Sequence, residues 1–152
     1  MSIIFTFEIN HNLKAPFFNV IGISYKNANT SVRGMFSLSL DQSKNLIKES
    51  LQAGIDNLVV NSTCNRVEIY TSTLDFNLLT ELLCKHSNGT VKEFKKFGKI
   101  AIVIPTKGKV EMLYECVKSF YDHCDYKIFD VYIADTGSTE EEKNWIKDNI
   151  LT

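Results

Sequence analysis

Hydrophobic and polar positions alternate along the chain with two different periods, which predicts a fold with both strands and helices. Short stretches rich in β-branched and aromatic residues predict strands. Longer stretches whose apolar residues recur at helical spacing predict amphipathic helices. Strands are expected at residues 17–24, 55–60, 66–72, 99–105 and 129–135, and helices at 37–54, 76–89, 110–121 and 138–150. The polar stretch 25–34 predicts a loop.

Two of the predicted helices carry the signals of a capped amino terminus. Ser39 is followed three residues later by Gln42, the spacing of a capping box in which each side chain bonds the other residue's backbone. Ser138 stands in the same relation to Glu141, and acidic residues in that first turn suit the positive end of the helix dipole. The pattern therefore predicts where these helices begin as well as that they form.

The pattern of apolar residues changes near Gly98, from alternating to continuous. The run 99–105 is continuously apolar after Lys99, as in strands that are covered on both faces of a parallel sheet. With the helix, strand and helix that follow, it predicts a β-α-β-α unit. The fold class is therefore α/β of the α+β kind, a small mixed sheet with helices, completed or followed by this unit. The expected division is a first domain at 1–98 and a second segment at 99–152.

Composition adds little to this pattern. The chain has 152 residues, 44% of them hydrophobic and 23% charged, with a net charge of −1, which is ordinary for a globular protein. Bulk charge therefore gives no indication of nucleic acid or of a membrane surface as partner. One short region is nonetheless rich in lysine, at Lys92, Lys95, Lys96, Lys99, Lys107 and Lys109. The lysines from Lys92 to Lys99 form either a solvated charged face or a contact for a tRNA backbone.

The cysteines favour a cytoplasmic protein with reduced thiols. The four, Cys64, Cys84, Cys116 and Cys124, include no C-x-x-C spacing, and the amino-terminal stretch lacks the pattern of a signal peptide. No stretch approaches the length of a membrane span. Cys84 stands among leucines on a predicted helix, where a core residue is expected. No spacing of cysteine and histidine predicts a metal site.

Cys64 differs because it lies in a predicted turn between two strands. A thiol is a nucleophile as thiolate, which neighbouring positive charge favours and which exposure makes accessible. Arg66 can supply that charge or bind a carboxylate with both ends of its guanidinium, and Thr63 and Asn65 offer donors for an oxyanion. No histidine base stands within the same motif, so the residues alone also allow a structural or incidental cysteine.

Three blocks of the sequence narrow these alternatives. "VIGISYKNA", "VRGMFSLS" and "AGIDNLVVNSTCNRVEIY" resemble, in order and spacing, the amino-terminal catalytic domain of glutamyl-tRNA reductase over about residues 17–97. The resemblance implies that Cys64 attacks the ester of glutamyl-tRNA to form a thioester, which NADPH reduces to glutamate 1-semialdehyde for tetrapyrrole (porphyrin) biosynthesis. It also implies that Arg66 and the loop around Asn27 recognise the glutamate, beside Thr63 and Asn65.

Several positions depart from the family pattern. Asn27 stands where the family has threonine, and Gly34 stands where it has glutamate after Arg33. The helix whose histidine assists the cysteine is missing, and Glu111 occupies roughly that place. The NADPH-binding domain and the dimerising helix of the family are not recognisable either. The resemblance thus implies an incomplete reductase, with NADPH binding and a homodimer unsupported by these residues.

The second segment resembles a different family. "KIAIVIPTKGKVEMLYECVKSF" followed by "FDVYIADTGSTEEE" is similar to the first fifty or so residues of a family 2 glycosyltransferase of the GT-A fold. That resemblance implies a nucleotide-sugar site with Asp135 on the nucleoside and Pro105 and Thr106 beside it. The alternatives are a structural unit in which Asp135 closes a turn, or a non-catalytic fusion whose second segment completes the first sheet.

Overall fold

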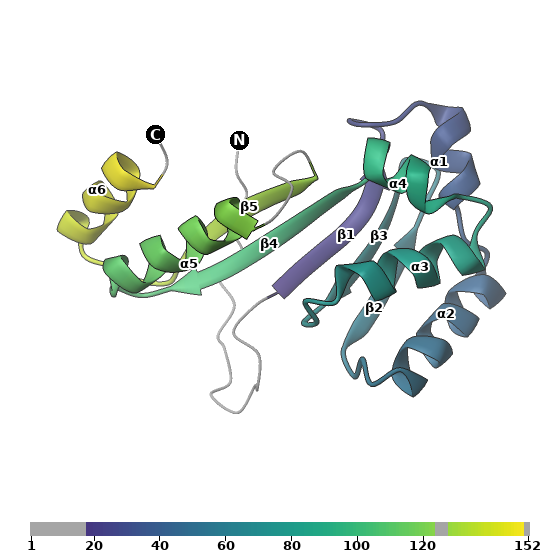
Figure 1. Cartoon of the computed structure of the whole chain (residues 1–152), viewed down its shortest axis with the longest axis horizontal. Coiled ribbons are helices and arrows are strands. Elements are labelled where there is room, and N and C mark those ends of the chain that lie inside the picture. Colours follow the sequence, from purple (N-terminus) through teal and green to yellow (C-terminus); the bar gives the residue numbers. More distant parts are fainter. Residues whose placement is uncertain (1–17, 124–127, 151–152) are drawn as a thin grey trace.

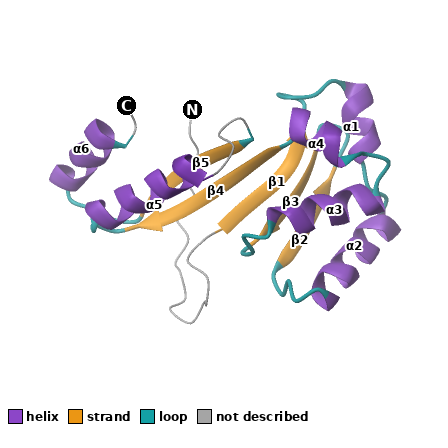
Figure 2. Ribbon diagram, in the orientation of Figure 1, coloured by secondary structure: helices purple, strands orange, loops and turns teal. Residues whose placement is uncertain are grey.

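The computed structural model describes residues 18–123 and 128–150, which fold into strands and helices in the mixed order that the sequence predicts (Figures 1 and 2). The elements are β1 (Phe18–Ser24), α1 (Thr30–Phe36), α2 (Leu40–Gln52), β2 (Leu58–Ser62), β3 (Arg66–Thr71), α3 (Phe76–His86), α4 (Val91–Phe97), β4 (Lys99–Thr106), α5 (Val110–His123), β5 (Phe129–Asp135) and α6 (Glu140–Asn149). Among these residues no helix is both long and apolar enough to cross a membrane.

The strands form one five-stranded sheet in the order β2-β3-β1-β4-β5. β1 pairs antiparallel with both β3 and β4, whereas β4 and β5 run parallel. The predicted fold class, a mixed sheet with helices, is confirmed. Ile21 of β1 lies directly opposite Ile100 of β4, so the strand that follows Gly98 belongs to the same sheet as the strands beside Cys64. The division at residue 98 stays a prediction.

One face of the sheet carries the core. Alternate residues of the three central strands point to this face and are buried there, including Ile21, Ile23, Val67, Ile69, Ile100 and Ile102. α2, α3 and α5 cover them (Figure 2), and Leu46, Leu83 and Leu113 of these helices belong to the same cluster. Each such side chain stabilises the fold by about 1.5–3 kcal/mol when it leaves water.

The segments before and after residue 98 also meet through aromatic rings. Phe76 of α3 packs edge-on against Phe129 of β5, with ring centroids 5.4 Å apart. Within the segment before residue 98, Phe36 of α1 and Phe94 of α4 meet in the same way at 6.1 Å, and both are almost wholly buried. A Cβ at Gly89 would lie 2.3 Å from the Phe36 ring, so only glycine leaves room for that ring.

The polar stretch 25–34 is not a loop throughout, because α1 begins within it at Thr30. Asn29 caps the helix by accepting a hydrogen bond from Val32 N at 3.0 Å. The buried Phe36 at the other end anchors the helix to the core. The loop prediction was wrong because one cap and one aromatic anchor suffice for a helix of two turns.

Two further helix starts differ from the sequence prediction. α4 has no predicted counterpart, and a capping box between Thr90 and Glu93 begins it. The cap of α6 lies one residue later than predicted, with Thr139 and Glu142 as the capping pair. Ser138 is not the cap because its hydroxyl accepts a hydrogen bond from Gly108 N at 2.9 Å. The capping box predicted at Ser39 and Gln42 is confirmed at the start of α2.

Candidate active site at the turn between β2 and β3

Cys64 is exposed at the tip of the turn that joins β2 to β3. Thr63 closes this turn, since its N–H donates to Arg66 O at 2.8 Å. The Thr63 hydroxyl accepts hydrogen bonds from the N–H groups of Asn65 and Arg66, both at 3.3 Å. The backbone that carries the thiol is therefore held from within the turn.

The loop that carries Asn27 lies beside this turn. Tyr25 N, just after β1, donates to Asn65 O at 2.9 Å and so joins the two segments. Ser24 O then accepts from the N–H groups of Asn27 and Ala28, both at 3.1 Å, which turns the chain back toward α1. The structure thus brings the Asn27 loop and the Cys64 turn together, although they are far apart in the sequence.

Arg33 of α1 spans these segments and was not among the predicted site residues. Its Nε donates to Cys64 O at 3.2 Å, and its Nη1 donates to Ala28 O at 2.7 Å. Its Nη2 donates to Thr30 Oγ1 at 3.2 Å. The rigid guanidinium fork suits three acceptors on three segments. The one sequence signal for this role was its place in the "VRGMFSLS" block.

Arg66 begins β3, opposite Ser24 of β1. Its Nη1 lies 3.5 Å from Glu68 Oε1, and 45% of its side chain is exposed. Glu68 Oε2 also accepts hydrogen bonds from the Tyr70 hydroxyl at 2.7 Å and from Asn61 Nδ2 at 3.4 Å. Burial, and then the neighbouring Glu68, raise the pKa of Tyr70. A long ion pair at an exposed position is weak, so Arg66 can turn to another carboxylate at little cost.

A shallow pocket of about 210 Å³ adjoins Glu68 on the sheet face that the helices leave open. Its lining includes Gly22, Asn27, Glu68, Lys99 and Asp130, but neither Cys64 nor Arg66. Gly22 keeps the floor flat, because a Cβ there would lie 2.2 Å from Val67 O. Asn27 therefore faces a polar pocket next to the turn rather than the thiol itself.

The other cysteines have different surroundings. Cys84 and Cys116 are half-buried, and burial raises the pKa of both thiols. Cys64 has no histidine bonded to its side chain among the described residues, and His86 bonds Glu49 instead. Glu111 lies in the first turn of α5, beyond the Thr106 end of β4, and so at the end of the sheet away from Cys64. No group of three metal-ligating side chains forms within the described ranges.

The residues of the second resemblance meet at that other end. Thr106 and Asp135, the last residues of β4 and β5, are paired in register, with Pro105 just before. Asp135 Oδ1 accepts from Ser138 N at 2.9 Å and from Gly137 N at 3.3 Å. Although burial acts to raise it, the pKa of Asp135 is lowered overall by hydrogen bonds from Ser138 and Gly137. Its carboxylate thus closes the turn before α6.

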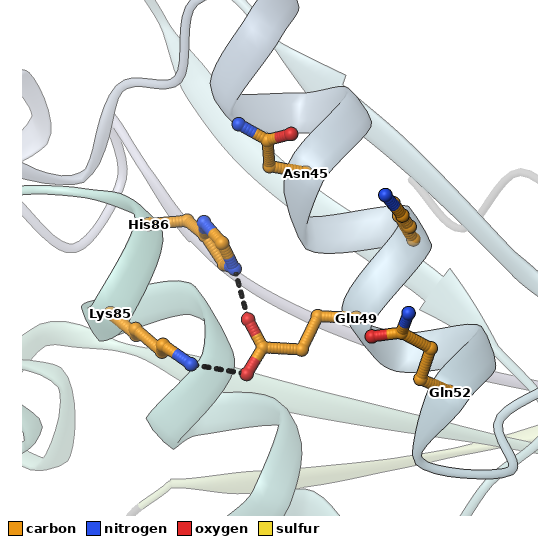
Figure 3. A pocket seen from close by; sticks show the side chains of 6 residues that line it. Asn45, Glu49, Gln52, Lys85 and His86 are labelled. Atoms are coloured by element: carbon orange, nitrogen blue, oxygen red, sulfur yellow. Dashed lines mark hydrogen bonds and ion pairs between the residues drawn. The ribbon is translucent and has the colours of Figure 1, made fainter.

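A second surface pocket lies between α2 and α3, where no sequence pattern predicted a site (Figure 3). Glu49 of α2 reaches between Lys85 and His86 of α3. It forms an ion pair with Lys85 and a hydrogen bond with His86 Nε2 at 2.8 Å. The bond from Lys85, and then that from His86, lower the pKa of Glu49. These contacts tie the two helices together at the surface.

Comparison with known proteins adds to this geometry. The family model of the glutamyl-tRNA(Glu) reductase N-terminal domain matches residues 21–121, from β1 into α5. A glutamyl-tRNA reductase of Christiangramia forsetii is 41% identical over 93 residues, which are 61% of this chain and 22% of that protein. That of Flavobacterium psychrophilum is 41% identical over 83 residues, 55% of this chain and 20% of its own. Glutamyl-tRNA reductase 2 of Flavobacterium johnsoniae is 41% identical over 92 residues, 60% and 21% of the two chains. The chain thus spans about a fifth of the length of these relatives.

Proposed function

The chain belongs to the glutamyl-tRNA reductase family through its N-terminal domain, and from this premise we propose that Cys64 accepts the glutamyl group of glutamyl-tRNA. The observation that carries the proposal is an exposed thiol at the tip of a turn held by hydrogen bonds from both sides. The relatives' name connects the family to this substrate, and the resemblance of the Cys64 block implies a place in tetrapyrrole biosynthesis.

The proposed step is an acyl transfer. The Cys64 thiolate attacks the carbonyl carbon of the ester, a C–S bond forms, and the bond from that carbon to the ribose oxygen breaks. The released oxygen takes up a proton, and the glutamyl group stays on sulfur as a thioester. The exposed side chain of Asn65 is the proposed donor to the developing oxyanion, because the N–H groups of Thr63, Asn65 and Arg66 are bonded within the turn.

Arg66 is the proposed recognition residue for the side-chain carboxylate of the glutamate. A guanidinium binds a carboxylate through two parallel hydrogen bonds, and the contact of Arg66 with Glu68 is long enough to be exchanged. Asn27 faces the adjoining pocket and would contact the amino-acid end of the substrate. Thr63 supports the turn through its hydroxyl, so its proposed contribution is to hold Cys64 in place.

The hydride donor implied by the family, NADPH, does not fit the residues of this chain. Dinucleotide sites of the Rossmann type need a G-x-G-x-x-G turn after a strand. The seven glycines of this sequence include no two that are separated by one residue. The chemistry proposed for these residues therefore ends with the thioester and its slow hydrolysis.

Acylation in vitro tests this function directly. The protein is incubated with glutamyl-tRNA, or with an activated glutamate ester, and the intact mass is measured before and after hydroxylamine. We expect one hydroxylamine-sensitive glutamyl adduct, which Cys64→Ser abolishes and which Cys84→Ser and Cys116→Ser retain. Equal labelling of Cys64→Ser would contradict the proposal.

A second candidate function uses the opposite end of the sheet. The loops after β4 and β5 lie against each other there, since Thr136 N donates to Thr106 O at 2.8 Å. In open α/β sheets such a pair of loops is where nucleotides bind. The family match extends to residue 121, however, so β4 and α5 also fit the reductase domain. A uridine nucleotide at millimolar concentration would shift the amide signals of Thr106 and Asp135 if this site exists, and unchanged signals would remove it.

A further inference from the structure

Three lysines form the solvent face of α4. Lys92, Lys95 and Lys96 are exposed at helical neighbour spacing, while Phe94 on the other side of the helix is buried. Lys92 and Lys95 have no ion-pair partner among the described residues, and Lys96 Nζ lies 4.9 Å from the centre of the Phe97 ring. Glu93, the acidic residue of the helix, is bonded to Thr90 in the capping box. The helix therefore carries three positive charges against the one negative charge of Glu93, whose carboxylate is held at the helix start.

A continuous set of contacts places this face at the Cys64 end of the sheet. α4 packs on α1 through Phe94 and Phe36, and Asn88 N, just before α4, donates to Met35 O at 2.8 Å. α1 in turn reaches Cys64 O through Arg33. Figure 1 shows α1 and α4 together at this end.

The other lysines of the same sequence region lie elsewhere. Lys107 and Lys109 follow β4, whose 8 residues separate them from α4. At ~3.3 Å per residue, this distance is roughly 25 Å. Lys99, at the start of β4, pairs with Asp130 at 3.6 Å. Of the two lysine groups on either side of β4, the one on α4 is therefore the one at the Cys64 end of the sheet.

We propose that Lys92, Lys95 and Lys96 bind the sugar-phosphate backbone of the RNA whose acylated end reaches Cys64. This proposal rests on the proposed function of Cys64. Ammonium groups without partners attract phosphates and release their counterions, so such a contact is independent of base sequence and sensitive to salt. The chain has a net charge of −1, so an RNA must find a local positive surface rather than a positive molecule.

Binding of an uncharged tRNA for glutamate, measured as a function of salt, tests the surface. The triple variant Lys92→Gln, Lys95→Gln, Lys96→Gln should bind about tenfold or more weakly at low salt, and its log–log salt slope should fall by about two. A matched triple variant at exposed lysines of other helices, Lys48→Gln, Lys118→Gln and Lys147→Gln, should keep both values. An unchanged affinity and slope in the α4 variant would overturn the proposal.

Acylation by an RNA-free glutamate ester separates this proposal from the one on which it rests. The α4 variant should be labelled at Cys64 as fast as the wild type, because these lysines do not touch the small ester. If Cys64 is never labelled while the α4 variant still loses tRNA, the proposed function fails and the surface stands. If labelling occurs and the α4 variant binds tRNA normally, the surface fails alone.

The three hydrogen bonds of Arg33 carry a second inference. They join the Cys64 turn, the Asn27 loop and the start of α1 through one half-buried side chain. We infer that Arg33 is a positioning residue, which sets the thiol at a fixed distance from the loop that contacts the amino acid. Lysine has no planar fork and cannot reproduce the three bonds together.

The kinetics of acylation by the RNA-free ester test this role. Arg33→Ala should lower the saturated rate by about tenfold to a hundredfold, since a misplacement of 1 Å is enough for such a loss. Millimolar guanidinium should restore part of that rate, and Lys44→Ala, at an exposed residue of α2, should not change it. Arg33→Lys keeps the charge and serves if the alanine variant does not fold. A lower melting temperature with an unchanged saturated rate and no rescue would overturn the inference.

Discussion

The two ends of β4 use polar groups in opposite ways. At the end near Lys99, Arg33 and the backbone of Tyr25 hold the Cys64 turn from outside, and the thiol itself stays exposed. At the end near Thr106, the Asp135 carboxylate accepts hydrogen bonds from Gly137 N and Ser138 N and so closes its own turn. A candidate functional group is available for chemistry where other residues hold its backbone, and is unavailable where it must hold the backbone itself.

The largest effect on this comparison is expected from Phe94→Ala. Phe94 is 1% exposed and joins α4 to Phe36 on α1, so its removal leaves a cavity under the helices that support Cys64. We expect a loss of about 3–5 kcal/mol in the free energy of unfolding, measured by urea denaturation. The partner variant at the other end is Tyr114→Ala, which removes the edge-on contact with Trp145 from a residue that is 38% exposed. A smaller loss for Phe94 than for Tyr114 would contradict the comparison.

Gly22→Ala should have the next largest effect. The new Cβ would lie 2.2 Å from Val67 O, a backbone atom of the neighbouring strand that cannot move without separating β1 from β3. We expect about 1–3 kcal/mol of destabilisation, seen as a lower melting temperature. Gly34→Ala is the control, because nothing lies within 4 Å of its Cβ and alanine favours the helix. Equal melting temperatures for the two variants would show that β1 and β3 have room to adjust.

The sequence was enough to predict most of the sheet, because the residues of its buried face recur at every second position within a strand. Ile21 and Ile23 alternate with Gly22 and Ser24, and the apolar run after Gly98 became β4. That run predicted a strand covered on both faces, but only every second residue of β4 is buried, because the helices cover one face of the sheet. α1 was missed because its stability comes from Phe36, whose partner Phe94 is far away in the sequence. The cap of α6 was misplaced because Ser138 and Thr139 both have an acidic residue three positions on. Only the hydrogen bond from the distant Gly108 N–H to the Ser138 hydroxyl decides between the two possible caps.

The candidate site was predictable to the same extent. Cys64 and Arg66 are neighbours in the sequence, so one short motif names both. Arg33 acts on Cys64 from 31 residues away, and its role follows from a fold that packs α1 beside the β2–β3 turn. A hydrogen bond of this kind depends on tertiary structure and leaves no local pattern.

A moderate effect is expected for Asp135→Ala at the Thr106 end. The carboxylate caps two backbone N–H groups, and the loss of such a cap typically costs about 1 kcal/mol. Because the pKa of Asp135 is lowered in the folded state, its contribution is fully present above the ordinary pKa of an aspartate. It is lost as the pH falls below about 4 and through the folded-state pKa. Thermal unfolding at several pH values should show wild type and variant converging in acid, and a constant difference would contradict this origin.

Glu68→Gln should have the smallest effect on stability and the sharpest on one titration. The Arg66–Glu68 pair is long and half exposed, so its loss should cost less than about 1 kcal/mol. Burial and Glu68 together raise the pKa of Tyr70, so removing the negative charge should lower that pKa while burial keeps it above the ordinary value. Carbon-13 NMR of labelled tyrosine follows the titration, with the exposed Tyr25 as the internal control. If the pKa of Tyr70 stays unchanged, Glu68 does not bond that hydroxyl in solution.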